Sequence, residues 1–229
     1  MRYLLMFLLI FSTTVFAYPS AKIYEFTFNN SSQNWLGDFA DYPRDSEEFY
    51  ELSWGWENVP DGHSPYKKAI FLAGNNHSDD LFMYVKTPIS GLKSHTNYAL
   101  TFSIDLLSSV PVGQMGIGGA EGEAVYVKVG AANIEPLKIL SGGQYLLNVN
   151  KGDQMSSGVN GVTIGNLANP LVDPNHRTYE TLSLSNSQNP LFIKSNDEGQ
   201  IWIFVGTDSG FEGITKYYIA KVKVNIQEK

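Results

Sequence analysis

The chain has 229 residues, no cysteine and a formal net charge of −7 at pH 7. The absence of cysteine excludes disulfides, thiol nucleophiles and thiolate metal ligands, so an exported domain of this composition must rely on its core for stability. The acidic balance, with Lys67-Lys68 as the only adjacent basic pair, indicates that the protein does not bind nucleic acid.

Residues 1–17, MRYLLMFLLIFSTTVFA, have the three parts of a secretory signal peptide. Arg2 is followed by an apolar run and then by small residues three positions and one position before the cleavage point. The run is too short for a membrane span, which needs about 20 apolar residues. We predict cleavage after Ala17, with retention as an anchor as the alternative. The expected product is a single domain over 18–229 without a membrane span, secreted or periplasmic and of bacterial origin.

The rest of the chain is predicted to be strands and loops. Strand-like segments rich in Val, Ile, Tyr and Phe lie at 21–28, 80–87, 97–106, 123–131, 200–206 and 216–226. Clusters of Gly, Asn, Ser, Asp and Pro separate them, and no window of helical length keeps an apolar period of 3.6 residues. The pattern predicts an all-β, antiparallel two-sheet β-sandwich.

Alternation within two of these segments predicts which side chains share a face. Val125, Val127 and Val129 are expected on one face of the strand at 123–131, opposite Tyr126 and Lys128. In the last segment the even positions from Tyr218 to Ile226 are expected on one face. The stretch 201–224 is interpreted as two antiparallel strands around the turn TDSGFEG.

Aromatic residues gather between positions 34 and 63. Trp54 and Trp56, in SWGWE, are two residues apart and would share one face of a strand. They would either form a platform that stacks on sugar rings or fill the core between the sheets. Trp35 and Tyr42 are further candidate ligand-binding residues.

The polar run GNNHSDD at 74–80 has two interpretations. It is favoured as a turn before the strand that follows, and the alternative is a calcium site in which Asn75, Asn76, Asp79 and Asp80 supply oxygen ligands. Asp208, in the turn near the C-terminus, is a further candidate ligand. The calcium interpretation predicts a structural cofactor. The glycine run at 112–122 lacks the Gly-Lys-Ser/Thr ending of a phosphate-binding loop and is expected to be a sandwich loop.

No catalytic residue is assigned. The acidic candidates on loops are too numerous to select a pair: Asp38, Asp41, Glu57, Asp79, Asp80, Asp208 and Glu212. No G-x-S-x-G element is present. Whether the chain is an enzyme is left open, with a non-catalytic protein favoured.

Two stretches carry a resemblance to a known group of proteins. TPISGLKSHTNYALTFSIDL (87–106) and the strand pair in 201–224 resemble the jelly-roll modules of the galactose-binding-like and carbohydrate-binding groups. The combination of DFADYP, GNNHSDDLFMY and GTDSGFEG also resembles a set of uncharacterised bacterial exported proteins. The first resemblance implies a jelly roll, often with a structural calcium, and a glycan or cell-surface component as partner. A secreted hydrolase acting on polysaccharide and an envelope or adhesion protein that binds a protein partner are the alternatives.

Overall fold

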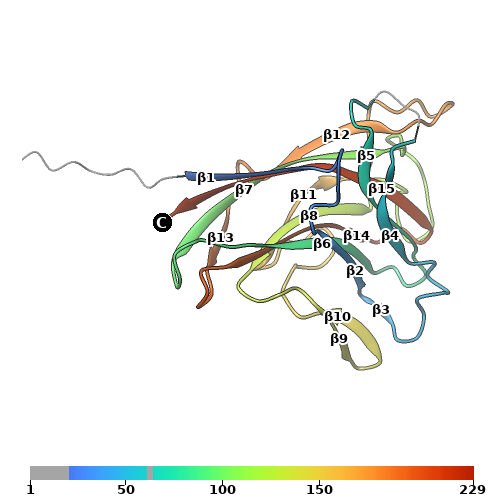
Figure 1. Cartoon of the computed structure of the whole chain (residues 1–229). Coiled ribbons are helices and arrows are strands. Elements are labelled where there is room, and N and C mark those ends of the chain that lie inside the picture. Colours follow the sequence, from blue (N-terminus) through green and yellow to red (C-terminus); the bar gives the residue numbers. More distant parts are fainter. Residues whose placement is uncertain (1–20, 61–63) are drawn as a thin grey trace, which may run out of the picture.

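A computed structural model describes residues 21–60 and 64–229, so the predicted signal peptide at 1–17 lies outside the described residues. The described part contains fifteen strands and no helix. No segment there can accordingly cross a membrane as an apolar helix. Two antiparallel sheets face each other, and a small third sheet lies below them in Figure 1. The predicted all-β, two-sheet sandwich is confirmed.

The larger sheet, called sheet A, has seven strands. Their order is β12 (Glu180–Ser185), β7 (Asn97–Ser108), β15 (Ile214–Glu228), β5 (Lys68–Asn75) and β4 (Ser53–Asn58), with β1 (Ala21–Thr27) beside β15 and β13 (Leu191–Lys194) beside β7. Sheet B has the order β11 (Gly161–Asn166), β8 (Val125–Ala132), β14 (Ile201–Ser209), β6 (Leu81–Ile89) and β2 (Leu36–Ala40). The small sheet consists of β3 (Tyr42–Pro43), β10 (Gln144–Leu147) and β9 (Lys138–Ser141).

The last two strands do not pair with each other, so the interpretation of 201–224 as a strand pair is wrong. β14 pairs with β6 and β8 in sheet B, whereas β15 pairs with β1, β5 and β7 in sheet A. The turn between them carries the chain from one layer to the other, as connections in Greek-key sandwiches commonly do. Alternation within a strand shows which of its faces is buried, but it does not identify its neighbour.

The core lies between the two sheets. Val125, Val127 and Val129 of β8 are buried there, as predicted. The prediction for β15 is only partly correct, because the strand register shifts between Ile219 and Lys221. This β-bulge places an extra residue in the strand and exchanges its two faces. Tyr218 therefore packs on the outer side of sheet A, whereas the residues that face the core are Tyr217, Ile219, Val222, Val224 and Ile226.

The outer face of sheet B is covered by the chain itself. The connection between β8 and β11, residues 133–160, includes the β9–β10 hairpin and packs Leu147 and Val149 against Phe82, Tyr84 and Phe204. The Phe82 and Tyr84 rings are stacked, with their centroids 5.0 Å apart. Charged side chains that a two-layer sandwich would expose on this face are consequently removed from water.

Candidate functional site

Trp35 and Tyr42, two of the candidate ligand residues, lie inside the protein. Each is 1% exposed. Trp35 packs edge-on against Phe26 and Phe28 in the core. The Tyr42 hydroxyl donates a hydrogen bond to Glu47 Oε1 at 3.1 Å and accepts one from Lys138 Nζ at 2.9 Å. Neither ring presents a face to solvent in this structure.

Trp54 and Trp56 lie on β4, at the edge of sheet A, and differ in exposure. Trp54 is 38% exposed, and its indole covers Gly37 of β2 so closely that a Cβ there would lie 2.3 Å from the ring. Glycine at position 37 thus lets the ring lie flat across the edge between the two sheets. Trp56 packs against the core, donates its Nε1–H to the Phe28 carbonyl at 2.7 Å and has Lys68 Nζ 4.0 Å from its ring centroid. Stacking of sugar on this pair stays a prediction, with Trp54 as the more accessible ring.

The polar run at 74–80 forms the end of β5 and the connection to β6, as the turn interpretation predicts. Asn76 is 2% exposed, and its amide donates to the carbonyls of Ser209 and Phe211 at 2.9 and 3.0 Å. Asn75 instead donates to Glu51 Oε1 at 2.9 Å. Asp79 is exposed and adopts a positive φ of 57°, which short polar residues tolerate in turns.

Two of the predicted metal ligands, Asp80 and Asp208, do come together, with Asp41 as a third acid. One carboxylate oxygen from each lies within 4.8 Å of the others. The ammonium of Lys151 enters this group from the 133–160 connection, 2.6 Å from Asp208 Oδ2 and 2.9 Å from Asp41 Oδ2. Lys128 Nζ lies 3.7 Å from Asp208 Oδ2. We call these five residues the acid–lysine cluster.

Burial dominates the electrostatics of the acid–lysine cluster. It raises the pKa of Asp80 to about 7, and the neighbouring carboxylates of Asp41 and Asp208 add to the shift. Burial also raises the pKa of Asp41, against the opposing effect of Lys151. For Lys151, burial favours loss of the proton, but Asp208 and Asp41 outweigh it and raise the pKa. Lys151 therefore enters the cluster as a cation in contact with two acids.

These residues fit a lysine cation better than a calcium ion. Asn75 and Asp79 point to other partners or to solvent, and a calcium ion at Asp80 and Asp208 would have to displace Lys151 from its two acids. We therefore expect a chelator to leave the Tm of protein prepared in calcium unchanged. A fall in Tm that added CaCl₂ reverses, measured by differential scanning fluorimetry, would instead support the calcium site predicted from the sequence.

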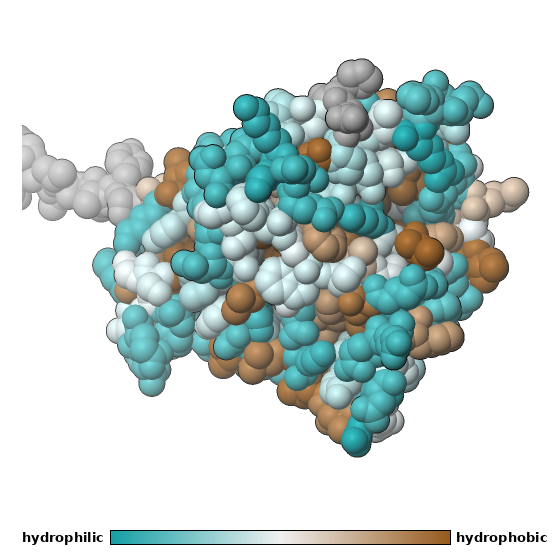
Figure 2. Space-filling view, turned by 45° about the vertical axis from the view of Figure 1, so that its right-hand side comes forward, coloured by the Kyte–Doolittle hydropathy of each residue, from teal (hydrophilic) through white to brown (hydrophobic). Residues whose placement is uncertain are grey.

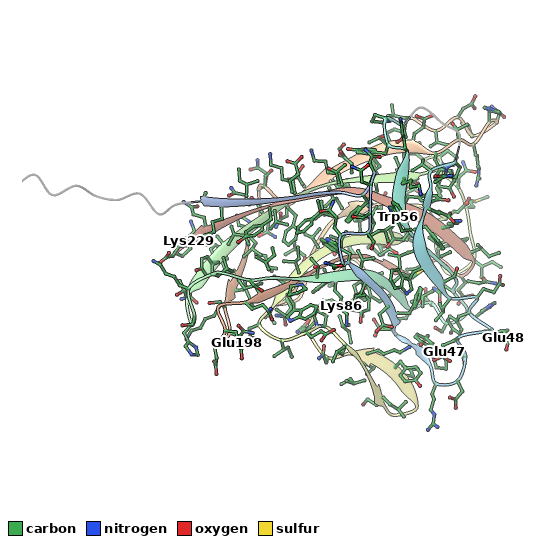
Figure 3. All side chains as sticks on the ribbon, viewed as in Figure 1. Glu47, Glu48, Trp56, Lys86, Glu198 and Lys229 are labelled. Atoms are coloured by element: carbon green, nitrogen blue, oxygen red, sulfur yellow. The ribbon has the colours of Figure 1, made fainter. Side chains whose placement is uncertain are left out.

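A separate open pocket of about 660 Å³ lies at the opposite end of β14 and contains the fourth tryptophan. Trp202 lines it together with His95, residues 133–135 and residues 194–198. The rim carries carboxylates, amides and a lysine, and His95 Nε2 lies 3.3 Å from Asp197 Oδ1. Lys86, buried beside this pocket, donates to the Pro136 carbonyl at 2.6 Å and pairs with Glu135 at 2.9 Å. Figure 3 shows Glu198, on the pocket rim, well separated from Trp56.

Sequence reasoning did not select Trp202, Asp41 or Lys151 for a site. Trp202 lies in a strand whose alternation is typical of a core segment, and Lys151 is far along the chain from Asp41 and Asp208. One feature of the sequence does indicate the covering layer. The uninterrupted apolar run Leu81–Val85 indicates a strand that is buried on both faces, and hence a covering layer on sheet B.

Comparison with known proteins finds similarity only in the fold. No family model matches the chain, and no curated protein matches it in sequence. Similar solved structures include carbohydrate-binding modules of the β-sandwich type and the enzymatically active domain of a bacteriophage tailspike protein. One is a mannan-recognising module, TmCBM27, with a TM-score of 0.41 and 11% identity over 92% of this chain and 99% of that one.

Two further structures show the same degree of likeness. The family 11 module from Clostridium thermocellum, in complex with a β-1,3-1,4-mixed-linked tetrasaccharide, has a TM-score of 0.38 and 11% identity over 91% of this chain and 96% of that one. A structure from a study of promiscuous specificity in carbohydrate-binding modules of the β-sandwich superfamily has a TM-score of 0.39 and 8% identity. The match covers 84% of this chain and only 57% of that one. The sandwich arrangement is shown by the sheets of this chain itself, and no ligand residue is carried over from these proteins.

Proposed function

We propose that this chain is an exported, non-catalytic β-sandwich protein that binds carbohydrate or a surface glycoconjugate. The observation that carries the proposal is the pocket at Trp202. It combines an indole with hydrogen-bonding side chains on three separate segments, as sites for small polar ligands do. A sugar ring has apolar C–H faces and hydroxyls at its edge, so an aromatic surface and surrounding carboxylates and amides match both parts.

Trp54 provides a second candidate contact. Its ring is 38% exposed and rests on Gly37, so one face is supported while part of the ring is open to solvent. Because Trp54 lies on the β4 edge and Trp202 on β14, we treat the two as separate contacts.

The first test is a glycan-array measurement on the purified protein, followed by affinity measurements on any glycan that binds. We expect Trp202→Ala to weaken binding at least about 30-fold, or about 2 kcal/mol, as loss of a central aromatic contact typically does. Phe49→Ala removes an aromatic side chain that is 64% exposed outside the pocket, and should leave affinity unchanged. Equal affinity of Trp202→Ala and the unmodified protein would contradict the proposed site.

The alternative functions predict different results. A hydrolase would release product from the same glycans, whereas binding without turnover supports the non-catalytic proposal. An envelope or adhesion protein would present a broad apolar contact area. On the face shown in Figure 2, hydrophobic side chains form separate patches among hydrophilic ones.

A further inference from the structure

The acid–lysine cluster contains the components of a reaction that the proposed carbohydrate binding does not use. Lys151 Nζ lies 2.6 Å from Asp208 Oδ2, the oxygen bonded to the carboxyl carbon that a nucleophile would attack. Both side chains are buried, Lys151 being 7% and Asp208 0% exposed. The Asp208 Oδ1 atom is also buried and has no hydrogen-bond partner among the described residues.

We propose that Lys151 and Asp208 join through an amide bond between Nζ and Cγ, so that the folded protein forms its own side-chain cross-link. The reaction is a condensation. The ammonium–carboxylate pair loses one water and becomes a neutral amide. No electrons are transferred, and no other reactant is required.

The neighbouring acids can move the two protons that Nζ must lose. Asp41 Oδ2 lies 2.9 Å from Lys151 Nζ and is placed to take the first proton, which leaves a lone pair to attack Cγ of Asp208. Asp80 has a carboxyl oxygen within 4.8 Å of carboxylate oxygens of Asp41 and Asp208, and burial raises its pKa to about 7, so rotation of its side chain brings a proton to the departing oxygen. Both protons end on Oδ1, which leaves as water, and Asp41 and Asp80 finish as they began.

The other carboxyl oxygen of Asp208 is held where negative charge would develop. Oδ2 accepts the backbone N–H of Gln154 at 2.9 Å, and Lys128 Nζ lies 3.7 Å away. Donors fixed around a developing oxyanion stabilise the tetrahedral intermediate. Oδ2 is thus assigned as the carbonyl oxygen of the amide, and the unpartnered Oδ1 as the leaving oxygen.

The surroundings of the cluster favour the product. An ion pair removed from water is expensive to keep charged, and condensation removes both charges. Lys151 is held on an ordered turn, with its N–H donating to the Val149 carbonyl at 3.1 Å and its own carbonyl accepting from Lys128. The departing water has an exit, because Asp41, Asp80 and Lys151 line an open pocket of about 260 Å³.

The test is the mass of the unmodified protein under denaturing conditions, combined with tryptic peptide mapping. We expect a mass lower by one water than the sequence requires, a branched peptide joining the segments around Lys151 and Asp208, and no cleavage after Lys151. A protein of full mass that trypsin cleaves after Lys151 would overturn the proposal, and so would a loss of water mapped to another position.

Substitutions test the role of each residue in forming the cross-link. Lys151→Arg should restore the full mass, and Asp80→Asn should leave most of the protein unlinked. Lys86→Arg, at another buried lysine that lies 2.9 Å from a carboxylate, should keep the loss of one water. A cross-link in Asp80→Asn at the level of the unmodified protein would overturn the role of Asp80. Because the unmodified protein gives the primary result, variants that fail to fold do not affect it.

Discussion

Replacing Lys151 by methionine is expected to lower the free energy of unfolding by about 3–5 kcal/mol at pH 7, since it leaves Asp41 and Asp208 buried without their cation and prevents the Lys151–Asp208 amide. Lys151 is the nearest cation to both Asp41 and Asp208, at 2.9 and 2.6 Å. Without it these acids must take up protons, attract solvent or distort the loop that covers sheet B. Denaturant unfolding monitored by tryptophan fluorescence measures the change.

A matched control separates this effect from the loss of any ion pair. Lys221 pairs with Glu25 at 2.9 Å, but their side chains are 30% and 45% exposed. Lys221→Met should therefore change stability by less than about 1 kcal/mol. The double variant Lys151→Met/Asp208→Asn should recover part of the loss, because it also removes an unpaired acid. Equal stability of Lys151→Met and the unmodified protein would show that the buried acids do not depend on this lysine.

The second large expected effect is a dependence of stability on pH that arises from Asp80. Burial raises its pKa in the folded protein from 3.8 to about 7. Between these values the folded state binds more protons at this group than the unfolded state, so stability falls as the pH rises from about 4 to 7 and then levels off. At about 1.4 kcal/mol per pKa unit, the contribution is on the order of 2–4 kcal/mol.

Asp80→Asn removes this dependence, because the amide stays neutral. In the Lys151→Arg background, where no cross-link can form, we expect Asp80→Asn to be more stable than Lys151→Arg alone above pH 7 and similar to it below pH 4. Asp79→Asn is the control, since the adjacent side chain is exposed and should leave the pH profile unchanged. The comparison requires urea unfolding curves at several pH values, and parallel profiles for Lys151→Arg with and without Asp80→Asn would contradict the shift.

Much of the fold follows from local pattern. The strand predicted at 123–131 corresponds to β8, and that at 97–106 corresponds to β7. Alternation and turn residues are local properties, so they identify strands and buried faces. The bulge near Ala220 is different, because it depends on how β15 must bend to pair with β7, and an alternating sequence contains no sign of it.

The acid–lysine cluster could be predicted only in part. Asp80 and Asp208 stand at the turn and strand positions that suggested metal ligands, and the structure does bring them together. Lys151 belongs to a connection whose sequence is typical of a loop. The position of Lys151 depends on how that loop packs over sheet B. Lys128 is a second residue whose surroundings could not be predicted. The prediction that it lies on the outward face of β8 is correct, but it is 0% exposed because a distant segment covers it.

The route of the chain between β8 and β11 determines whether sheet B has an exposed aromatic face. These strands are antiparallel neighbours, so a tight hairpin would suffice to join them. Residues 133–160 instead make a long excursion that closes one side of the sandwich. A chain in which a short turn replaced this excursion would display Phe82, Tyr84 and Phe204 as an open aromatic surface on sheet B. The excursion therefore acts as a lining that keeps this surface from contact with other molecules.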